Sequence, residues 1–354
     1  MKLSRPTHLV TLAYCIFALA IFMAPRAVGA PPPPITWQAT AGSQSTDKGI
    51  QALAFLPNEL WIHAGDSITW SFPTHEIHTV TFLTQTIKDL QNTTPQQTRP
   101  ARPGAGGGCP GTTPDGSIFD GSTCVTSGDD LFVDGATYTV TFPTAGNFKL
   151  VCLVHNNMTG AVHVLARSEA LPYNQASYDK QAQQREAELL SGGAGLKGQG
   201  TATAQQSAGD AVTAGIGDIV ATGGGSDTVS VMRFLQGSIV VRIGDTVEWT
   251  NLDPVTPHTV TFGTEPSGPP QPPSPGVTSA SDGARQAVLN SPAGSVHSGF
   301  LQAAFQDRGP PDALPQSPLG VTRFRVTFNA PGTFNYICAL HDDLGMVGRV
   351  IVHR

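Results

Sequence analysis

The chain has 354 residues, which is too long for one small β-sandwich and long enough for two ordinary domains with connecting segments. Hydrophobic residues make up 39% of it, and the 39 Gly and 29 Pro residues favour many short strands joined by loops over a helix-rich enzyme. The formal net charge of -6 gives no basic surface of the kind that binding to phosphates requires, so we expect no nucleic-acid partner.

The first thirty residues have the order typical of a secretory signal peptide. Basic residues precede a mostly apolar run from Leu9 to Ala24, and small residues follow it. We predict cleavage after Gly29, so that residues 1–29 are removed and the protein is exported to the periplasm, the cell envelope or the outside of the cell. The alternative is an uncleaved membrane anchor, although the run is shorter than the roughly 20 residues that span a bilayer.

Residues 36–166 are predicted to form the first domain. Near both of its ends, apolar and polar residues alternate around tight turns, which is typical of half-buried strands. The stretch between them, about residues 84–130, is rich in Pro, Gly, Ser and Gln, so we expect a loop insertion there. Because export implies an oxidising compartment, we predict a disulfide between Cys109 and Cys124, which bracket a Gly- and Pro-rich part of this stretch.

Residues 167–225 are predicted to connect the two domains. The part from Tyr173 to Leu190 is rich in Ala, Gln, Glu and Lys and is predicted to form a helix. The part from Ser191 to Gly225 has the Gly- and Ala-rich composition of a linker. An alternative is that some of it, such as Ile216 to Ala221, adds a strand to the second domain.

Residues 226–354 are predicted to form a second domain that repeats the first. The sequence GDTVEW at 244–249 corresponds to GDSITW at 65–70, and a later block from Phe324 to His341 corresponds to the block from Tyr138 to His155. A second loop insertion is expected at about residues 264–318. The predicted fold class is therefore all-β, with two similar sandwiches joined by a linker that contains a helix.

Two cysteines, Cys152 and Cys338, occupy matching positions in the two repeats. An unpaired thiol in an exported protein needs a reason to exist, and matched surroundings indicate one special thiolate in each domain. Cys338 begins a C-x2-H-x4-M motif, and Cys152 begins a shorter C-x2-H-x2-M motif; a further histidine lies upstream of each. The candidate metal ligands are therefore His78, Cys152, His155 and Met158 in the first repeat, and His258, Cys338, His341 and Met346 in the second.

This combination of side chains suits a single copper ion. Imidazole binds both oxidation states of copper, thiolate holds the cuprous ion, and a weak axial thioether tunes the reduction potential. One Cys-x-x-His motif would be weak support, but four ligand types in the same order in both repeats form a specific signal. We therefore predict one type 1 copper ion per domain, cycling between Cu(I) and Cu(II).

The second domain resembles plastocyanin and pseudoazurin, whose C-x2-H-x4-M loop it reproduces, and the first is similar to amicyanin, which has the shorter loop. This resemblance to the cupredoxin (blue copper) family covers about residues 36–166 and 226–354. It implies Greek-key sandwiches of about eight strands and an electron carrier that meets its redox partner proteins in small, transient contacts. An exposed edge of His155 or His341 would then be the port through which electrons enter and leave.

Two other functions are compatible with such domains. A multicopper oxidase or a nitrite-reductase-like enzyme needs further copper ions, held by His-x-His pairs or by a histidine directly before the ligand cysteine. Val151 and Ile337 occupy those preceding positions, and the chain contains no His-x-His. A copper storage or delivery protein predicts Met-rich or His-rich runs, but the chain has only five Met. We therefore expect a carrier and not an enzyme.

Three further polar residues are expected to play no direct part in binding metal. Asn251 precedes His258 and is expected to fix the loop that carries this histidine. His75, close to His78, is expected to point away from the metal. His297 has no partner at ligand spacing and is predicted to lie on the surface.

Overall fold

The computed structural model describes residues 33–83, 116–128, 135–155, 157–207, 210–267, 272–303 and 320–354. The predicted signal peptide and Cys109 lie outside these residues, so the export signal and the disulfide with Cys124 stay predictions. No helix within the described ranges combines the length and the apolar character needed to cross a membrane.

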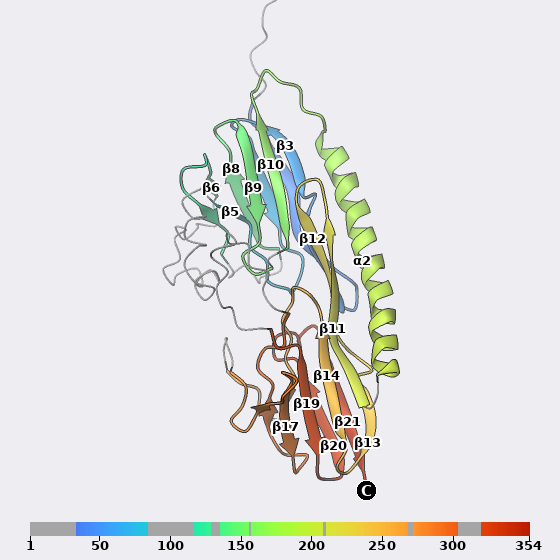
Figure 1. Cartoon of the computed structure of the whole chain (residues 1–354). Helices are drawn as coiled ribbons and strands as arrows, with labels where there is room; N and C mark the ends of the chain where they lie inside the picture. The colour runs from blue at the N-terminus through green and yellow to red at the C-terminus, as the bar shows by residue number, and fades with distance from the viewer. Residues whose placement is uncertain are drawn as a thin grey trace, which may run out of the picture. The chain divides into compact units, whose positions relative to one another are not determined.

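The first domain is a sandwich of two β-sheets (Figure 1). Strands such as β3 and β4 alternate buried and part-exposed residues, because one face of each strand packs on the core between the sheets. The strand orders are β2-β1-β4-β8-β6 in one sheet and β3-β10-β9-β5-β7 in the other. The strands are β1 (Thr36–Gln44), β2 (Ile50–Leu56), β3 (Glu59–His63), β4 (Ser67–Ser71), β5 (Thr81–Phe82), β6 (Ser117–Ile118), β7 (Val125–Thr126), β8 (Thr137–Thr141), β9 (Gly146–Val151) and β10 (Thr159–Leu165).

The second domain repeats this arrangement. Its sheets have the orders β12-β11-β14-β19-β17-β16 and β13-β21-β20-β15-β18, and a core rich in aromatic residues lies between them. The strands are β11 (Asp210–Ala221), β12 (Ser226–Leu235), β13 (Ser238–Arg242), β14 (Thr246–Leu252), β15 (Thr261–Phe262), β16 (Thr278–Ser279), β17 (Arg285–Leu289), β18 (Val296–His297), β19 (Arg323–Phe328), β20 (Gly332–Ile337) and β21 (Val347–His353). The predicted all-β class with two similar sandwiches is confirmed.

Short strands run through both segments that we expected to be loop insertions. β6 and β7 lie in the first of these segments, and β16, β17 and β18 lie in the second. β17 pairs in parallel with β19 and buries Ala287 and Leu289 in the core. Its alternation extends over only five residues, and the Pro- and Gly-rich sequence around it concealed this short strand.

The connection between the domains contains one long helix, α2 (Gln175–Gln206). It begins after Asn174, whose side chain accepts a hydrogen bond of 3.0 Å from the backbone N–H of Ser177. The prediction that it ends near Leu190 was wrong. Glycine disfavours a helix, but Gly193 packs so closely against β2 and β12 that any β-carbon there would lie 2.3 Å from a methyl carbon of Ile50. Close packing on the strands thus stabilises the helix beyond that point.

The rest of the predicted linker is also ordered. β11 pairs antiparallel with β12 and parallel with β14, which are the same relations that β1 has with β2 and β4. The second repeat therefore begins at Asp210, earlier than the predicted residue 226. The alternative in which Ile216 to Ala221 adds a strand was correct in kind, but the strand is longer.

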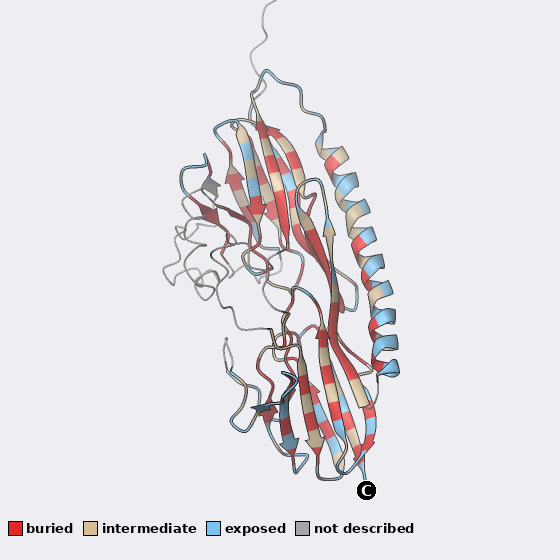
Figure 2. Cartoon of the chain, viewed as in Figure 1, coloured by how far each residue is buried: buried red, intermediate tan, exposed pale blue. Residues whose placement is uncertain are grey.

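One sheet continues from the first domain into the second. β12 pairs antiparallel with β2, from Thr228 opposite Leu53 to Val231 opposite Ile50. α2 covers the other face of these strands, so every residue of β2 is buried between the sandwich core and the helix (Figure 2). The helix also supplies Arg185, which pairs with the fully buried carboxylate of Asp227 at 2.7 Å.

Candidate metal centres

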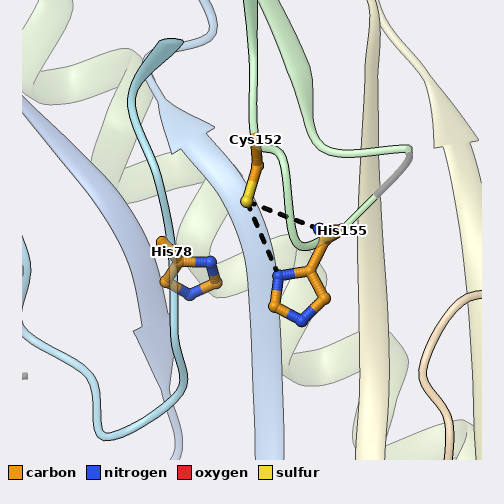
Figure 3. Close-up of side chains that lie close together, drawn as sticks. All are labelled: His78, Cys152 and His155. Atoms are coloured by element: carbon orange, nitrogen blue, oxygen red, sulfur yellow. Dashed lines mark hydrogen bonds between the residues drawn. The ribbon is translucent and has the colours of Figure 1, made fainter. Parts of the chain in front are cut away.

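The first candidate centre combines residues from two separate segments (Figure 3). His78 lies between β4 and β5, whereas Cys152 directly follows β9 and His155 lies in the loop from β9 to β10. All three are buried, and one donor atom from each lies within 4.8 Å of the others. The sulfur of Cys152 is 3.8 Å from Nδ1 of His155 and accepts a hydrogen bond of 3.5 Å from the backbone N–H of that residue.

The second candidate centre has the same construction. Cys338 directly follows β20, and His341 lies in the next loop, while His258 precedes β15. The Nδ1 atoms of the two histidines are 3.1 Å apart, and the sulfur of Cys338 lies 3.9 Å from Nδ1 of His258 and 3.4 Å from Nδ1 of His341. The structure thus brings together both predicted groups of two histidines and one cysteine.

These donor atoms fit a soft metal ion. Nδ1 of His78 is buried without a hydrogen-bond partner, which is costly unless another group satisfies it. The backbone N–H groups of Thr79 and Thr259 donate to the sulfurs of Cys152 and Cys338, at 3.4 and 3.3 Å. Such hydrogen bonds stabilise a thiolate and, around a copper-bound sulfur, tune the reduction potential. Two imidazoles and one thiolate are the trigonal donor set of a blue copper site.

Both cysteines favour the thiolate, which is the form that binds metal. Burial alone would raise the pKa of Cys152, but hydrogen bonds and charge from His155 and His78 lower it well below its ordinary value. The pKa of Cys338 is likewise well below its ordinary value, because His341 and His258 outweigh the effect of burial. Because the thiolate and not the thiol binds metal, a lowered pKa favours metal binding at each sulfur.

The two ligand loops differ in length but close in the same way. The backbone N–H of Cys152 donates to the carbonyl of Met158 at 2.9 Å, and that of Cys338 donates to the carbonyl of Met346 at 3.0 Å. Both methionines are fully buried in their domain cores. This common closure supports the alignment of Met158 with Met346, and binding of their sulfur atoms to the metal stays a prediction.

A sequence model of copper-binding proteins of the plastocyanin/azurin family matches residues 42–165 and 220–353, which together make up most of the chain. The chain belongs to this family. It is a two-domain cupredoxin and a copper-binding protein of the electron-transfer type, and each matched region contains one of the buried His–Cys–His groups.

Two solved structures are similar to parts of the chain. The oxidised form of plastocyanin from Dryopteris crassirhizoma is 24% identical with a TM-score of 0.19, and the match covers 40% of this chain and 99% of that chain. A reduced tryptophan-to-tyrosine mutant of amicyanin is 18% identical with a TM-score of 0.22, covering 42% of this chain and 89% of that chain. Because these TM-scores are low, membership of the cupredoxin family rests on the sequence model.

In both cupredoxin domains a glycine leaves room for the ring of the upstream histidine, which we did not predict from the sequence. Gly42 and Gly215 lie at irregularities of β1 and β11 with φ of 83° and 84°. A β-carbon at Gly42 would lie 2.3 Å from Nε2 of His78, and one at Gly215 would lie 2.1 Å from Nε2 of His258. The sequence Thr-Ala-Gly occurs at 40–42 and again at 213–215, so the repeat itself carried the signal.

The predicted electron port does not lie open to solvent. His155 and His341 are 2% and 4% exposed, and their outer Nε2 atoms face the carboxylate of Glu76 at 3.3 and 3.7 Å. Burial alone would raise the pKa of Glu76, but the hydrogen bond from His155 and the nearby histidine charges lower it to about 2. The prediction of an exposed histidine edge was therefore wrong, because both rings are buried and the carboxylate of Glu76 faces their outer nitrogen atoms.

Asn251 fixes the loop before His258, as predicted. Its side-chain amide donates to the carbonyl of Thr256 at 3.0 Å and to that of Leu301 at 2.7 Å. His75 is exposed and belongs to neither group of ligands.

His297 is buried, which corrects the prediction that it lies on the surface. Its Nδ1 atom is 2.8 Å from the hydroxyl of Thr261, which is 3.3 Å from that of Thr259. In the first domain, Thr126 occupies the corresponding place beside Thr81. Burial, together with the charge of Arg285, lowers the pKa of His297, and its Nε2 atom has no partner.

We expect His297→Thr to make the stability of the protein less sensitive to acid. The pKa of His297 is lowered in the folded state, so below its ordinary value of 6.5 the unfolded chain takes up a proton that the folded chain does not. Between pH 7 and pH 5, the free energy of unfolding should therefore fall more for wild type than for His297→Thr, by up to about 1.4 kcal/mol per pH unit. Urea unfolding at both pH values measures this. The exposed His353→Thr is the control, and equal slopes for wild type and His297→Thr would contradict the expectation.

Proposed function

We propose that this protein is an exported electron carrier with one type 1 copper ion in each domain. His78, Cys152, His155 and Met158 would hold one ion, and His258, Cys338, His341 and Met346 would hold the other. The proposal rests chiefly on the buried convergence of two imidazoles and one thiolate, which occurs once in each repeat. Each copper ion would supply a reversible one-electron step, Cu(I) to Cu(II), at a nearly fixed ligand geometry.

The surroundings of the ligands support a carrier. Hydrogen bonds to both sulfurs and the tight loop closures hold the ligands rigidly, which limits rearrangement when the oxidation state changes. Within the described ranges no third group of His, Cys, Asp or Glu side chains is close enough to hold a metal ion. The sequence likewise lacks the histidines that a multicopper oxidase uses for its further copper ions. Export is supported by the signal-like first thirty residues, and the partners would be redox proteins that bind transiently.

The oxidised protein should be intensely blue and contain two copper ions per chain. Thiolate-to-copper charge transfer gives this colour, so visible absorption and metal analysis of the purified protein test the proposal directly. Cys152→Ser and Cys338→Ser should each remove one copper ion and the absorption of one centre. Assays of phenol oxidation and nitrite reduction on the same sample separate a carrier from an enzyme. Two bound ions without colour would refute the blue sites, and turnover in either assay would refute the carrier.

A further inference from the structure

The side chain of Glu76 lies between the two candidate copper centres. Oε1 is 3.3 Å from Nε2 of His155, in the first domain, and Oε2 is 3.7 Å from Nε2 of His341, in the second. The Glu76 side chain is only 8% exposed. One buried carboxylate therefore contacts a ligand of each centre, with a different oxygen directed toward each.

The imidazole rings of His155 and His341 each contact a cysteine on one side and Glu76 on the other. Nδ1 of His155 faces the sulfur of Cys152, and Nδ1 of His341 faces the sulfur of Cys338, so that Nε2 of each ring is left for the carboxylate. We propose that Glu76 joins the two centres into one coupled unit and provides the connection for electron exchange between them, through His155, Glu76 and His341. This inference rests on the proposed function and extends it from two separate carriers to a pair.

Hydrogen bonds between the domains hold this arrangement in place. Ser226, at the start of β12, donates to the carbonyl of Asn157 in the first ligand loop at 2.7 Å. Arg233, further along β12, donates to the carbonyl of Leu344 in the second ligand loop at 2.6 Å and also to the carbonyl of Asp47 in the first domain. Both ligand loops are thus attached to the strand that joins the sheets, which fixes their positions on either side of Glu76.

Only the first repeat supplies a carboxylate that reaches the other centre. Glu76 lies two residues before His78, and the residue two before His258 is Thr256. The hydroxyl of Thr256 is 3.0 Å from that of Ser230, and its carbonyl accepts the hydrogen bond from Asn251. The second repeat therefore uses this position to hold its own loop, and only the first repeat uses it to reach the other centre.

The negative charge of Glu76 should act on both centres. A nearby anion stabilises the cupric state, which carries one more positive charge than the cuprous state, so removing this anion should raise both reduction potentials. With copper bound, the exchange would oxidise one cuprous centre and reduce the cupric centre across Glu76 by the same electron. No proton and no further reactant are required.

The test compares Glu76→Gln and Glu76→Thr with wild type and with Glu59→Gln. Glu76→Gln keeps the size of the side chain, and Glu76→Thr introduces the residue of the second repeat. Glu59→Gln is a matched control, since Glu59 also contacts a histidine, His163 at 3.0 Å, away from both sites. Spectroelectrochemistry of the copper-loaded proteins gives the potential of each centre, with Cys152→Ser and Cys338→Ser assigning the spectra. Fast reduction by one electron per chain gives the rate of exchange.

A coupled pair predicts that both potentials rise and that exchange slows in the Glu76 variants, with no change in Glu59→Gln. In wild type, filling one site should change the Cu(I) affinity of the other by a factor in the range of roughly 5 to 150, equal in both directions, and the Glu76 variants should reduce this factor. Loss of copper from the second site on changing Glu76 would also support sharing. A shift confined to the first centre, or unchanged exchange in both Glu76 variants, would overturn the coupling. A wild-type protein without blue copper would instead refute the proposed function.

Discussion

Gly42→Ala is expected to remove copper from the first centre while leaving the second centre occupied. The backbone at Gly42 has φ of 83°, where a side chain costs roughly 1–2 kcal/mol, and the added β-carbon would meet the ring of His78 at 2.3 Å. The ring can then no longer keep its position beside Cys152. Because the surroundings of a ligand typically contribute 10- to 100-fold to metal affinity, we expect a loss of at least that size at this centre.

A control variant at a second glycine distinguishes crowding of the His78 ring from backbone strain. Gly135, in the same domain, has φ of 82°, but a β-carbon there would meet nothing within 4 Å. Gly135→Ala should therefore show the conformational cost without the loss of copper. Cu(I) competition titrations and copper counts on both variants measure the difference. Equal copper affinity in Gly42→Ala and Gly135→Ala would show that the glycine does not position His78.

Arg185→Met should destabilise the metal-free protein by about 3–5 kcal/mol, the usual cost of leaving a buried charge without its partner. The carboxylate of Asp227 is fully buried, and Arg185 contacts it at 2.7 Å from helix α2. Burial raises the pKa of Asp227 even with Arg185 present. The folded variant will then bind a proton more readily than the unfolded chain, so its deficit should shrink as the pH falls toward the ordinary pKa of aspartate.

Two further variants make the measurement specific. Arg185→Met combined with Asp227→Asn removes the lone charge and should recover most of the lost stability. Lys197→Met, on the same helix, removes only an exposed contact of 3.9 Å with Asp47, which is worth at most about 1 kcal/mol. Urea unfolding followed by circular dichroism reports each value. A loss in Arg185→Met no larger than that in Lys197→Met would contradict the importance of the buried pair.

The sequence was sufficient to predict the sandwiches and the ligand types because both depend on local patterns. Alternation of apolar residues identified the longer strands, and fixed spacing after Cys152 and Cys338 identified the ligands that follow them. Upstream, the flanking Thr-Val-Thr-Phe sequences pointed to His78 and His258. The structure brings these two histidines to Cys152 and Cys338 together with His155 and His341.

Features that depend on contacts between segments far apart in the sequence were not predictable in this way. The side chain of Glu76 has no partner nearby in the sequence, and its contact with His341 joins the two repeats, as the pairing of β2 with β12 does. Helix α2 continues through glycines that would end an isolated helix, since two of them, Gly193 and Gly200, fit closely against the strands beneath the helix. The burial of His297 follows from the position of β18, a strand of two residues that leaves no periodic signal.

The pairing of β2 with β12 also means that the first repeat relies on the second to cover one edge of its sheet. A fragment ending before Asp210 would leave the backbone groups of β2 unpaired at the edge of a sheet, and such an edge readily recruits strands from other molecules. The same cut would strip Val229 from the cluster that Ala52, Ala54 and Leu189 form beneath α2. Residues 33–354 form one compact unit, so we expect a first repeat cut away from the second to aggregate more readily than the whole chain.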